Sequence, residues 1–342
     1  MSRTGEPLLS VRDLQVSFPV FGGVLRHKVA EIRAVDGVSF DLHQGEVLGL
    51  VGESGSGKTT VGRAIMNIIR FMSPEATLGG QILFNTDDGP VDLNGLRRRT
   101  MRPHRAEIAM IFQDPYSSLN PRMTVRQIVE GPLAIHTTLS RTDRQKHVLD
   151  LLDRVGLQPD YAGRYPHEFS GGQRQRIGIA RALATRPKLI IADEPVSALD
   201  VSVQAQVINL MQELQADFGL TYIFIAHDLS VVHHIADRIG VLYLGKIAEL
   251  GGADEVYRTP RHPYSRALLS AVPKPDPRAD HSGRVRLEGD IPTPMAKPSG
   301  CVFRTRCPVA VDRCANDVPA LEDHGGGRLV ACPEVRGESE DQ

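Results

Sequence analysis

Three segments near the start of the chain have the hydrophobic spacing of β-strands. Apolar and polar residues alternate in Leu9–Phe18 and in Val35–Leu42, whereas Val47–Val51 is an apolar run. Alternation is typical of a strand with one buried face, and a short continuous run is typical of a strand buried on both faces. The pattern therefore predicts three strands, the third of them fully buried.

A helix is predicted directly after the third strand. Val61, Ala64, Ile65 and Ile68 recur at helical spacing within Lys58–Arg70. The turn between strand and helix, residues 52 to 57, is rich in glycine. This stretch is predicted to be a strand, a loop and a helix in series.

The same alternation of strand and helix returns later in the chain. A polar, helical pattern from about 124 to 165 suggests an inserted helical subdomain, and Lys188–Ala192 and Tyr222–Ala226 read as short buried strands. After about residue 258 the sequence becomes rich in proline, which indicates a semi-extended tail joined by turns. The alternation predicts an α/β sheet with helices on its faces.

The glycine-rich turn carries a phosphate-loop motif. Gly52-Glu-Ser-Gly-Ser-Gly-Lys58-Thr59 fits the pattern in full and lies between a buried strand and a helix, as the mechanism requires. Glycines let the backbone N–H groups and the positive end of the helix dipole surround a polyanion. We expect Lys58 to contact the β and γ phosphates of a nucleotide and Thr59 to ligate Mg²⁺.

Two carboxylates follow the apolar strand at 188 to 192. Asp193 and Glu194 lie where water is scarce and where a charge needs a partner. Mg²⁺ would supply a partner for Asp193, and Glu194 would polarise the attacking water as a general base or as an orienting group. The alternative is that Glu194 only caps the turn before Pro195.

A second anion site is predicted at the start of another helix. Ser170 stands at an N-cap position with Gln173 three residues later, which is a capping-box pattern, and Gly171 and Gly172 lie between them. An exposed helix start of this kind presents backbone N–H groups to an anion. One phosphate loop does not need two such sites unless the second serves a neighbouring molecule.

Composition limits the classes of function. Forty basic and forty-one acidic residues among 342 give a formal net charge of -1, so no global field attracts nucleic acid or anionic lipid. The basic run Arg97–Arg105 contains no aromatic residue to stack on bases, which favours a solvated face. No apolar stretch approaches the roughly 18 residues that span a bilayer, and Met1–Pro7 lacks the apolar core of a signal peptide. We expect no nucleic-acid partner, and a cytoplasmic protein that reaches a membrane only through other subunits.

Together these motifs resemble the nucleotide-binding subunit of an ATP-binding-cassette (ABC) transporter. The resemblance covers residues 8 to about 255 and adds a glutamine loop at Gln113, a D-loop ending at Asp200 and a switch histidine at His227, all in the family's order. It implies a P-loop NTPase core with an antiparallel β subdomain, a helical subdomain at about 120 to 185 and a cysteine-containing extension. The expected domains are 8–258 and 259–342.

The resemblance also assigns roles to individual residues. It implies a head-to-tail dimer in which each ATP lies between the Lys58 side of one subunit and the Ser170 helix of the other. Gln113 would touch Mg²⁺ and the water, and His227 would contact the γ phosphate, although a histidine at a strand end is also commonly a core residue. Phe18 resembles the residue that stacks on adenine, with Phe21 close by and a long loop at 19 to 34. The expected ATP-binding residues are Phe18, Gly52, Glu53, Ser54, Gly55, Ser56, Gly57, Lys58, Thr59, Thr60, Ser170, Gly171, Gly172, Gln173 and Asp200.

The tail resembles the C-terminal extension of oligopeptide and dipeptide importers. Arg261–Pro273 and the segments around Cys301, Cys307 and Cys332 carry this resemblance. It implies an ATPase that drives peptide uptake at the cytoplasmic face of the membrane, with two permeases, an extracytoplasmic binding protein and a second ATPase, a paralogue being favoured over a copy. Nickel or glutathione is an alternative substrate. A soluble cassette ATPase acting on DNA or ribosomes is a rival that the single cassette and the importer-type tail disfavour.

All the cysteines lie in this tail, at Cys301, Cys307, Cys314 and Cys332. A cytoplasmic protein does not rely on disulfides, and the absence of a Cys-x-x-Cys pair weakens a zinc site. Prolines directly after Cys307 and Cys332 are compatible with an iron-sulfur cluster, and the resemblance implies a [4Fe-4S] cluster of structural purpose. Zinc and reduced structural thiols remain the alternatives.

Overall fold

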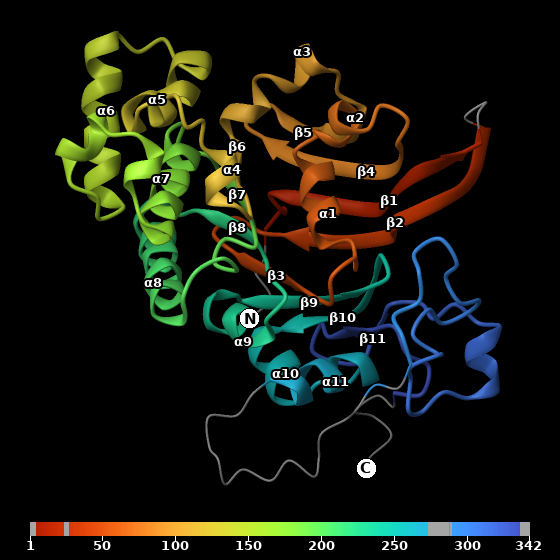
Figure 1. Cartoon of the computed structure of the whole chain (residues 1–342). Coiled ribbons are helices and arrows are strands. Elements are labelled where there is room, and N and C mark those ends of the chain that lie inside the picture. Colours follow the sequence, from red (N-terminus) through yellow and green to blue (C-terminus); the bar gives the residue numbers. More distant parts are fainter. Residues whose placement is uncertain (1–4, 24–26, 273–286, 288, 336–342) are drawn as a thin grey trace, which may run out of the picture. The chain divides into compact units, whose positions relative to one another are not determined.

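The computed structural model describes residues 5–23, 27–272, 287 and 289–335 (Figure 1). The chain groups into two compact units. Unit 1 comprises residues 1–6, 43–47 and 95–225, and unit 2 comprises residues 7–42, 48–94 and 226–342. The boundary therefore passes through strand β3 (Val47–Val51), and each unit is described by itself.

An antiparallel sheet forms one part of unit 2. Its strands are β1 (Leu9–Gly22), β2 (His27–Leu42), β4 (Thr77–Thr86) and β5 (Gly89–Asp92), in the order β2-β1-β4-β5. The prediction of a long loop at 19 to 34 is wrong, because strands β1 and β2 extend into this segment. Strands β1 and β2 stay paired from Leu9 opposite Leu42 to Gly22 opposite His27, so the backbone groups of this segment bond to each other as a long hairpin.

A second sheet in unit 2 joins the core to the tail. Strand β3 pairs in parallel with β9 (Arg238–Tyr243), which pairs antiparallel with β10 (Lys246–Gly252). Two short tail strands, β12 (Leu329–Val330) and β11 (Glu322–Asp323), continue this ladder beyond β10. The helices of unit 2 are α1 (Lys58–Ile65), α2 (Ile69–Met72), α9 (Leu229–Ile235), α10 (Ala253–Arg258), α11 (Pro263–Ala271) and the 3-10 turn η5 (Asp312–Ala315).

The helix predicted over Lys58–Arg70 is broken in two. Helix α1 ends at Ile65, and Asn67 adopts a positive φ of 51° before α2 begins at Ile69. The buried Asn67 side chain donates a 2.8 Å hydrogen bond to the carbonyl of Leu93. Asparagine tolerates the left-handed conformation, so this tertiary contact overrides the helical spacing.

A parallel sheet lies at the centre of unit 1. Strand β7 (Leu189–Asp193) is flanked by β6 (Ile108–Ile111) and β8 (Thr221–Ile225), and all five residues of β7 and of β8 are buried. The main helices are α5 (Val125–His136), α6 (Arg141–Arg154), α7 (Gly171–Leu183) and α8 (Val201–Phe218). Short turns complete the unit: η1 (Leu93–Gly95), which straddles the unit boundary, α3 (Arg98–Met101), η2 (His104–Ala106), α4 (Pro115–Ser118), η3 (Pro159–Gly163) and η4 (Pro166–Glu168).

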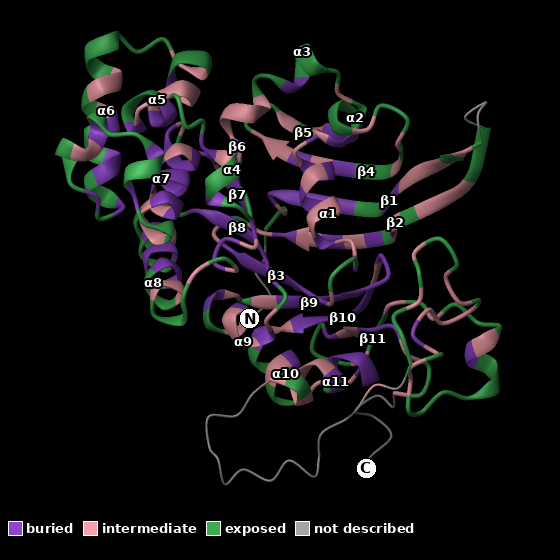
Figure 2. Cartoon of the chain, viewed as in Figure 1, coloured by how far each residue is buried: buried purple, intermediate pink, exposed green. Residues whose placement is uncertain are grey.

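Burial follows the predicted patterns (Figure 2). Helix α5 buries Val125, Ile128, Val129 and Leu133 on one face, as an amphipathic helix should. The arginines at 97, 98, 99 and 102 are exposed, as a solvated face predicts, whereas Arg105 at the end of the basic run is half-buried. Among the described residues, no helix combines the length and apolarity needed to cross a membrane.

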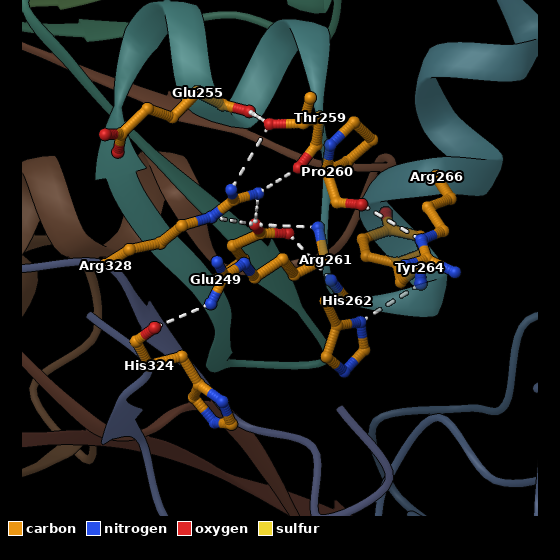
Figure 3. A network of polar contacts seen from close by, with 10 residues as sticks. All are labelled: Glu249, Glu255, Thr259, Pro260, Arg261, His262, Tyr264, Arg266, His324 and Arg328. Carbon is orange, nitrogen blue, oxygen red and sulfur yellow. Dashed lines mark hydrogen bonds and ion pairs between the residues drawn. The ribbon is translucent and has the colours of Figure 1, made fainter. Parts of the chain in front are cut away.

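A buried ion pair anchors the tail within unit 2 (Figure 3). Glu249 on β10 is fully buried and accepts hydrogen bonds from Arg328 Nη2 at 2.6 Å and Nε at 3.0 Å. The backbone N–H groups of Arg261 and His262 also donate to this carboxylate, each at 3.0 Å. A buried charge needs such partners, so the pair fixes the extension to the sheet.

Candidate functional site

The phosphate loop of unit 2 adopts a backbone that only glycine accepts at two positions. Gly52 and Gly57 have φ values of 151° and 102°. A Cβ atom at Gly57 would lie 2.3 Å from the carbonyl oxygen of Ala34, and one at Gly52 would lie 2.2 Å from that of Leu242. Gly52 and Gly57 are therefore required by close approach of other backbone as well as by φ, whereas Gly55 is favoured only by its φ of 80°.

Lys58 begins helix α1 and folds back over the loop. Its Nζ donates to the carbonyl oxygens of Gly52 at 2.7 Å and Glu53 at 3.0 Å, and to Ser56 Oγ at 3.2 Å. The residue is only 4% exposed. The helix has Gly57 at its N-cap with no side-chain cap, which is the arrangement that suits a phosphate group.

The remaining loop residues vary in exposure. Ser54 and Gly55 are exposed, whereas Thr59 and Thr60 are half-buried in the first turn of α1. Phe18 is half-buried on β1, opposite Ile32 of β2. Its expected stacking on adenine stays a prediction.

The carboxylates of unit 1 lie at the end of β7. Asp193 is 1% exposed, and Glu194 follows with a positive φ of 46°. The Glu194 backbone N–H donates to the carbonyl of Ile225 at 2.9 Å, and Gln113 Nε2 donates to Glu194 Oε2 at 2.8 Å. A left-handed glutamate costs free energy, and such strain is found where a side chain must point in one direction.

The glutamine loop meets the carboxylates because β6 and β7 are neighbours. Ile111 at the end of β6 is opposite Ala192 of β7, so Gln113 emerges beside Glu194. The structure thus brings together two residues that are 81 positions apart and were predicted separately.

Helix α7 holds the segment that follows Gln113. The guanidinium of Arg174 stacks 3.7 Å from the ring centroid of Tyr116, and Arg181 Nη1 donates to the carbonyl of Ser118 at 2.6 Å. Asp114 caps α4 by accepting from the Tyr116 N–H, and this hydrogen bond lowers the pKa of its carboxyl. The two arginines were not predicted, because nothing in their local sequence indicates these partners.

The capping box at Ser170 is confirmed. Gln173 N–H donates to Ser170 Oγ at 3.3 Å, and Ser170 N–H donates to Gln173 Oε1 at 3.0 Å. Ser170 and Gly171 are exposed, while Gly172 packs against α8 so closely that a Cβ there would lie 2.5 Å from Val203 Cγ1. Asp200 is exposed at the N-cap of α8.

His227 follows β8 and is exposed. A core histidine would be buried, so the structure excludes that interpretation. Its contact with the γ phosphate stays a prediction.

The four cysteines lie in unit 2 as free thiols, with Cys314 buried and the others half-buried. Burial chiefly raises the pKa of Cys301, Cys307 and Cys332, to about 11 for Cys307, and the other thiols raise each value further. Backbone N–H groups donate to these three sulfurs and partly offset the rise. In the described part of the chain, no group of three or more histidine, cysteine or acidic residues is placed to hold a metal ion, so the geometry does not support the expected cluster.

Two residues that sequence reasoning missed contact the phosphate loop. Tyr264 Oη accepts from the Glu53 N–H at 2.9 Å, and Arg306 pairs with the Glu53 carboxylate at 2.8 Å. Both lie in tail segments that carried the family resemblance, but no local motif marks them as neighbours of the loop.

Comparisons with known proteins agree with this geometry. The family model "ABC transporter" matches residues 35–197, and "Oligopeptide/dipeptide transporter, C-terminal region" matches residues 248–314. The oligopeptide transport ATP-binding protein AppF of Bacillus subtilis is 53% identical over 96% of this chain and 97% of its own length. The protein OppF of Salmonella typhimurium, with the same description, is 52% identical over 96% of each chain.

A solved structure supports the fold. The dimeric ATP-binding cassette MJ0796, determined with ADP and Pi, is 28% identical, with a TM-score of 0.59 over 72% of this chain and 98% of its own. The chain belongs to the ABC transporter ATP-binding proteins, in the branch that carries the oligopeptide/dipeptide transporter C-terminal region. The predicted α/β P-loop fold is thereby confirmed.

Proposed function

We propose that this chain is the ATP-hydrolysing subunit of an importer of dipeptides and oligopeptides. The observation that carries the catalytic part is Glu194, which stands at the end of β7 and is joined to Gln113. The peptide assignment is supported by relatives whose names state oligopeptide transport and by the matching C-terminal region. Nickel or glutathione uptake and a soluble role on nucleic acid are not favoured by these relatives.

ATP binding is assigned to the residues of the phosphate loop. The backbone N–H groups of the loop, other than the N–H of Glu53 that bonds to Tyr264, and the ammonium of Lys58 would hold the β and γ phosphates. Lys58 Nζ now donates to three oxygens of the loop, and phosphate oxygens would replace these acceptors when ATP binds. Thr59, Gln113 and Asp193 would hold Mg²⁺, which supplies charge neutralisation on the phosphates. Their side-chain oxygens suit this hard cation.

Hydrolysis is assigned to Glu194. Its carboxylate accepts a proton from the attacking water or orients that water, and Gln113 fixes the carboxylate by its 2.8 Å hydrogen bond. His227 contacts the γ phosphate in this proposal. The exposed position of His227 after β8 is compatible with that role.

The second ATPase subunit is proposed to complete the site. The capped start of α7 at Ser170 would bind the nucleotide of the partner, with Asp200 communicating between the two sites. The dimeric state of the related cassette MJ0796 supports this arrangement. A paralogue is favoured over a copy as the partner, and two permeases with an extracytoplasmic binding protein would place the chain at the cytoplasmic face of the membrane.

The domains 8–258 and 259–342, with a helical subdomain at about 120–185, belong to the same proposal.

The extension is also proposed to hold a [4Fe-4S] cluster, with Cys301, Cys307, Cys314 and Cys332 as its ligands. Its support is the donor set in the sequence, namely four cysteines in one stretch of the extension with prolines directly after Cys307 and Cys332. A cation at this position would favour the thiolates that burial disfavours. Iron and sulfide analysis of anaerobically purified protein tests it, and an iron-free protein with a fully occupied zinc site would overturn it.

Replacement of Glu194 tests the catalytic assignment. We expect Glu194→Gln to bind ATP, to keep the dimer closed and to lower turnover of the assembled complex at least about 100-fold, because general-base catalysis contributes roughly 10²–10⁴-fold. The matched control is Glu213→Gln, which alters an exposed carboxylate on α8. ATP hydrolysis and ATP binding are measured side by side. Wild-type turnover in Glu194→Gln would refute the assigned role.

A further inference from the structure

Glu53, the second residue of the phosphate loop, has every polar group engaged within unit 2. Its N–H donates to Tyr264 Oη at 2.9 Å, and its carbonyl accepts from Lys58 Nζ at 3.0 Å. Its carboxylate accepts from both terminal nitrogens of Arg306, with Nη1 to Oε2 at 2.8 Å and Nη2 to Oε1 at 3.2 Å. The loop is therefore held at this residue from three directions.

Two of the three partners come from the C-terminal extension. Tyr264 lies on α11, and Arg306 lies between Cys301 and Cys307. They are 211 and 253 positions from Glu53 along the chain. The extension thus contacts the nucleotide-binding loop directly. The contact through Arg306 comes from the segment of the extension that carries Cys301 and Cys307.

The two partners are themselves fixed by burial. The Arg306 side chain is 8% exposed, and Tyr264 is fully buried with its ring centroid 4.7 Å from Tyr243 and 5.3 Å from Phe303. A bidentate arginine–carboxylate pair has a defined geometry as well as a favourable charge interaction. Burial raises the pKa of Tyr264, so its hydroxyl stays protonated and neutral.

We propose that Arg306 and Tyr264 are positioning residues of the nucleotide site, which fix the phosphate loop at Glu53 so that ATP affinity depends on the C-terminal extension. The inference rests on the proposed function, in that the ligand of the loop is a nucleotide. Neither residue touches the phosphates, and both act through Glu53.

The physical reason is preorganisation. A glycine-rich loop binds phosphates when its N–H groups converge, and an untethered loop loses conformational entropy each time it adopts that arrangement. Release of Glu53 should therefore weaken nucleotide binding without altering the chemical step. In the assembled transporter the KM for ATP rises while kcat is retained, which is the signature of lost uniform binding.

Equilibrium binding of a fluorescent ATP analogue with Mg²⁺ to the full-length chain tests the proposal. The variants are Arg306→Gln, which removes the charge, Arg306→Lys, which keeps the charge without the fork, and Tyr264→Phe, which removes only the hydroxyl. The matched control is Arg304→Gln in the same segment, because Arg304 bonds to Ser299. The thermal midpoint of each variant is measured alongside to confirm that it is folded.

We expect Arg306→Gln to weaken nucleotide binding about five- to tenfold, as for the loss of a charged hydrogen-bonded pair, with Arg306→Lys and Tyr264→Phe intermediate and Arg304→Gln unchanged. Glu53→Gln combined with Arg306→Gln should bind no more weakly than Arg306→Gln alone, because the two residues act as one pair. Wild-type affinity in a folded Arg306→Gln variant, or an equal loss in Arg304→Gln, would overturn the inference. A folded wild type that binds no nucleotide would instead overturn the proposed function.

Discussion

Two glycine-containing turns in this chain each lead into a helix. One is stabilised by residues next to it in the sequence, and the other by residues far away along the chain. The start of α7 is fixed by its own neighbours, since Ser170 and Gln173 cap each other within three residues. The phosphate loop has no side-chain cap at Gly57 and is fixed at Glu53 by Tyr264 and Arg306, while the carbonyl of Ala34 lies close against Gly57. The first arrangement is encoded locally, whereas the second depends on residues far away along the chain.

This difference has a functional meaning for an ATPase of two half-sites. In the proposed arrangement the α7 start would bind the partner's nucleotide, so it would gain from being correctly shaped before the partner arrives. The phosphate loop must hold its own nucleotide and receives its shape from the sheet and the extension. Under the two proposals, nucleotide binding is therefore the step that Tyr264 and Arg306, far away along the chain, would influence.

The largest expected effect is at the phosphate loop itself. Gly57→Ala places a Cβ 2.3 Å from a backbone oxygen at a φ of 102°, and backbone cannot move aside cheaply. We expect a loss of roughly 2–4 kcal/mol in the free energy of unfolding and nucleotide binding weakened more than about 100-fold. Denaturant unfolding and equilibrium binding measure the two effects.

Gly178→Ala is the control for that change. Gly178 lies inside α7 with no neighbouring atom within 4 Å of an added Cβ. Alanine is the better helix former, so stability should rise by up to about 1 kcal/mol with nucleotide binding unchanged. If Gly57→Ala behaved like Gly178→Ala, the loop would not depend on distant backbone.

The anchor of the extension should show the next largest effect on nucleotide binding, with a loss of stability similar to that of Gly57→Ala. Arg328→Met leaves the fully buried Glu249 with only the N–H donors of Arg261 and His262 among the contacts in Figure 3. Breaking a buried ion pair costs about 3–5 kcal/mol, and the backbone donors should place this variant near the lower end. Thermal unfolding measures the loss, and nucleotide affinity should fall with it because the extension carries Arg306. Arg313→Met, at a half-exposed pair with Glu334, is the control and should cost under about 1 kcal/mol.

The smallest effect is expected at the locally encoded turn. Ser170→Ala removes the side-chain cap of α7 and should cost about 1 kcal/mol of stability. Ser140→Ala removes the equivalent cap of α6, where Asp143 N–H donates to Ser140 Oγ at 3.2 Å, and should cost the same. Only Ser170→Ala should lower ATP hydrolysis by the assembled complex, since only α7 faces the partner's nucleotide in the proposal. Equal hydrolysis by the two variants would argue against the shared site.

Much of this protein could be predicted from its sequence. Periodicity located the strands β3, β7 and β8 within a residue, and the motifs identified the phosphate loop, the carboxylates and the capping box. These features depend on residues within about ten positions of one another, so local physics decides them. The predicted helix over Lys58–Arg70 failed because Asn67 bonds to the distant carbonyl of Leu93.

The sequence by itself determined the class of protein and the chemistry of its motifs, because glycine, lysine and carboxylate spacing reflects what phosphate and Mg²⁺ require. Only the tertiary structure decided what holds those motifs in place. The contact of Gln113 with Glu194 spans 81 positions, and the contacts of Glu53 with Tyr264 and Arg306 span 211 and 253. No periodicity records such pairs, since each partner is chosen by the packing of strands and helices that meet only in the folded chain.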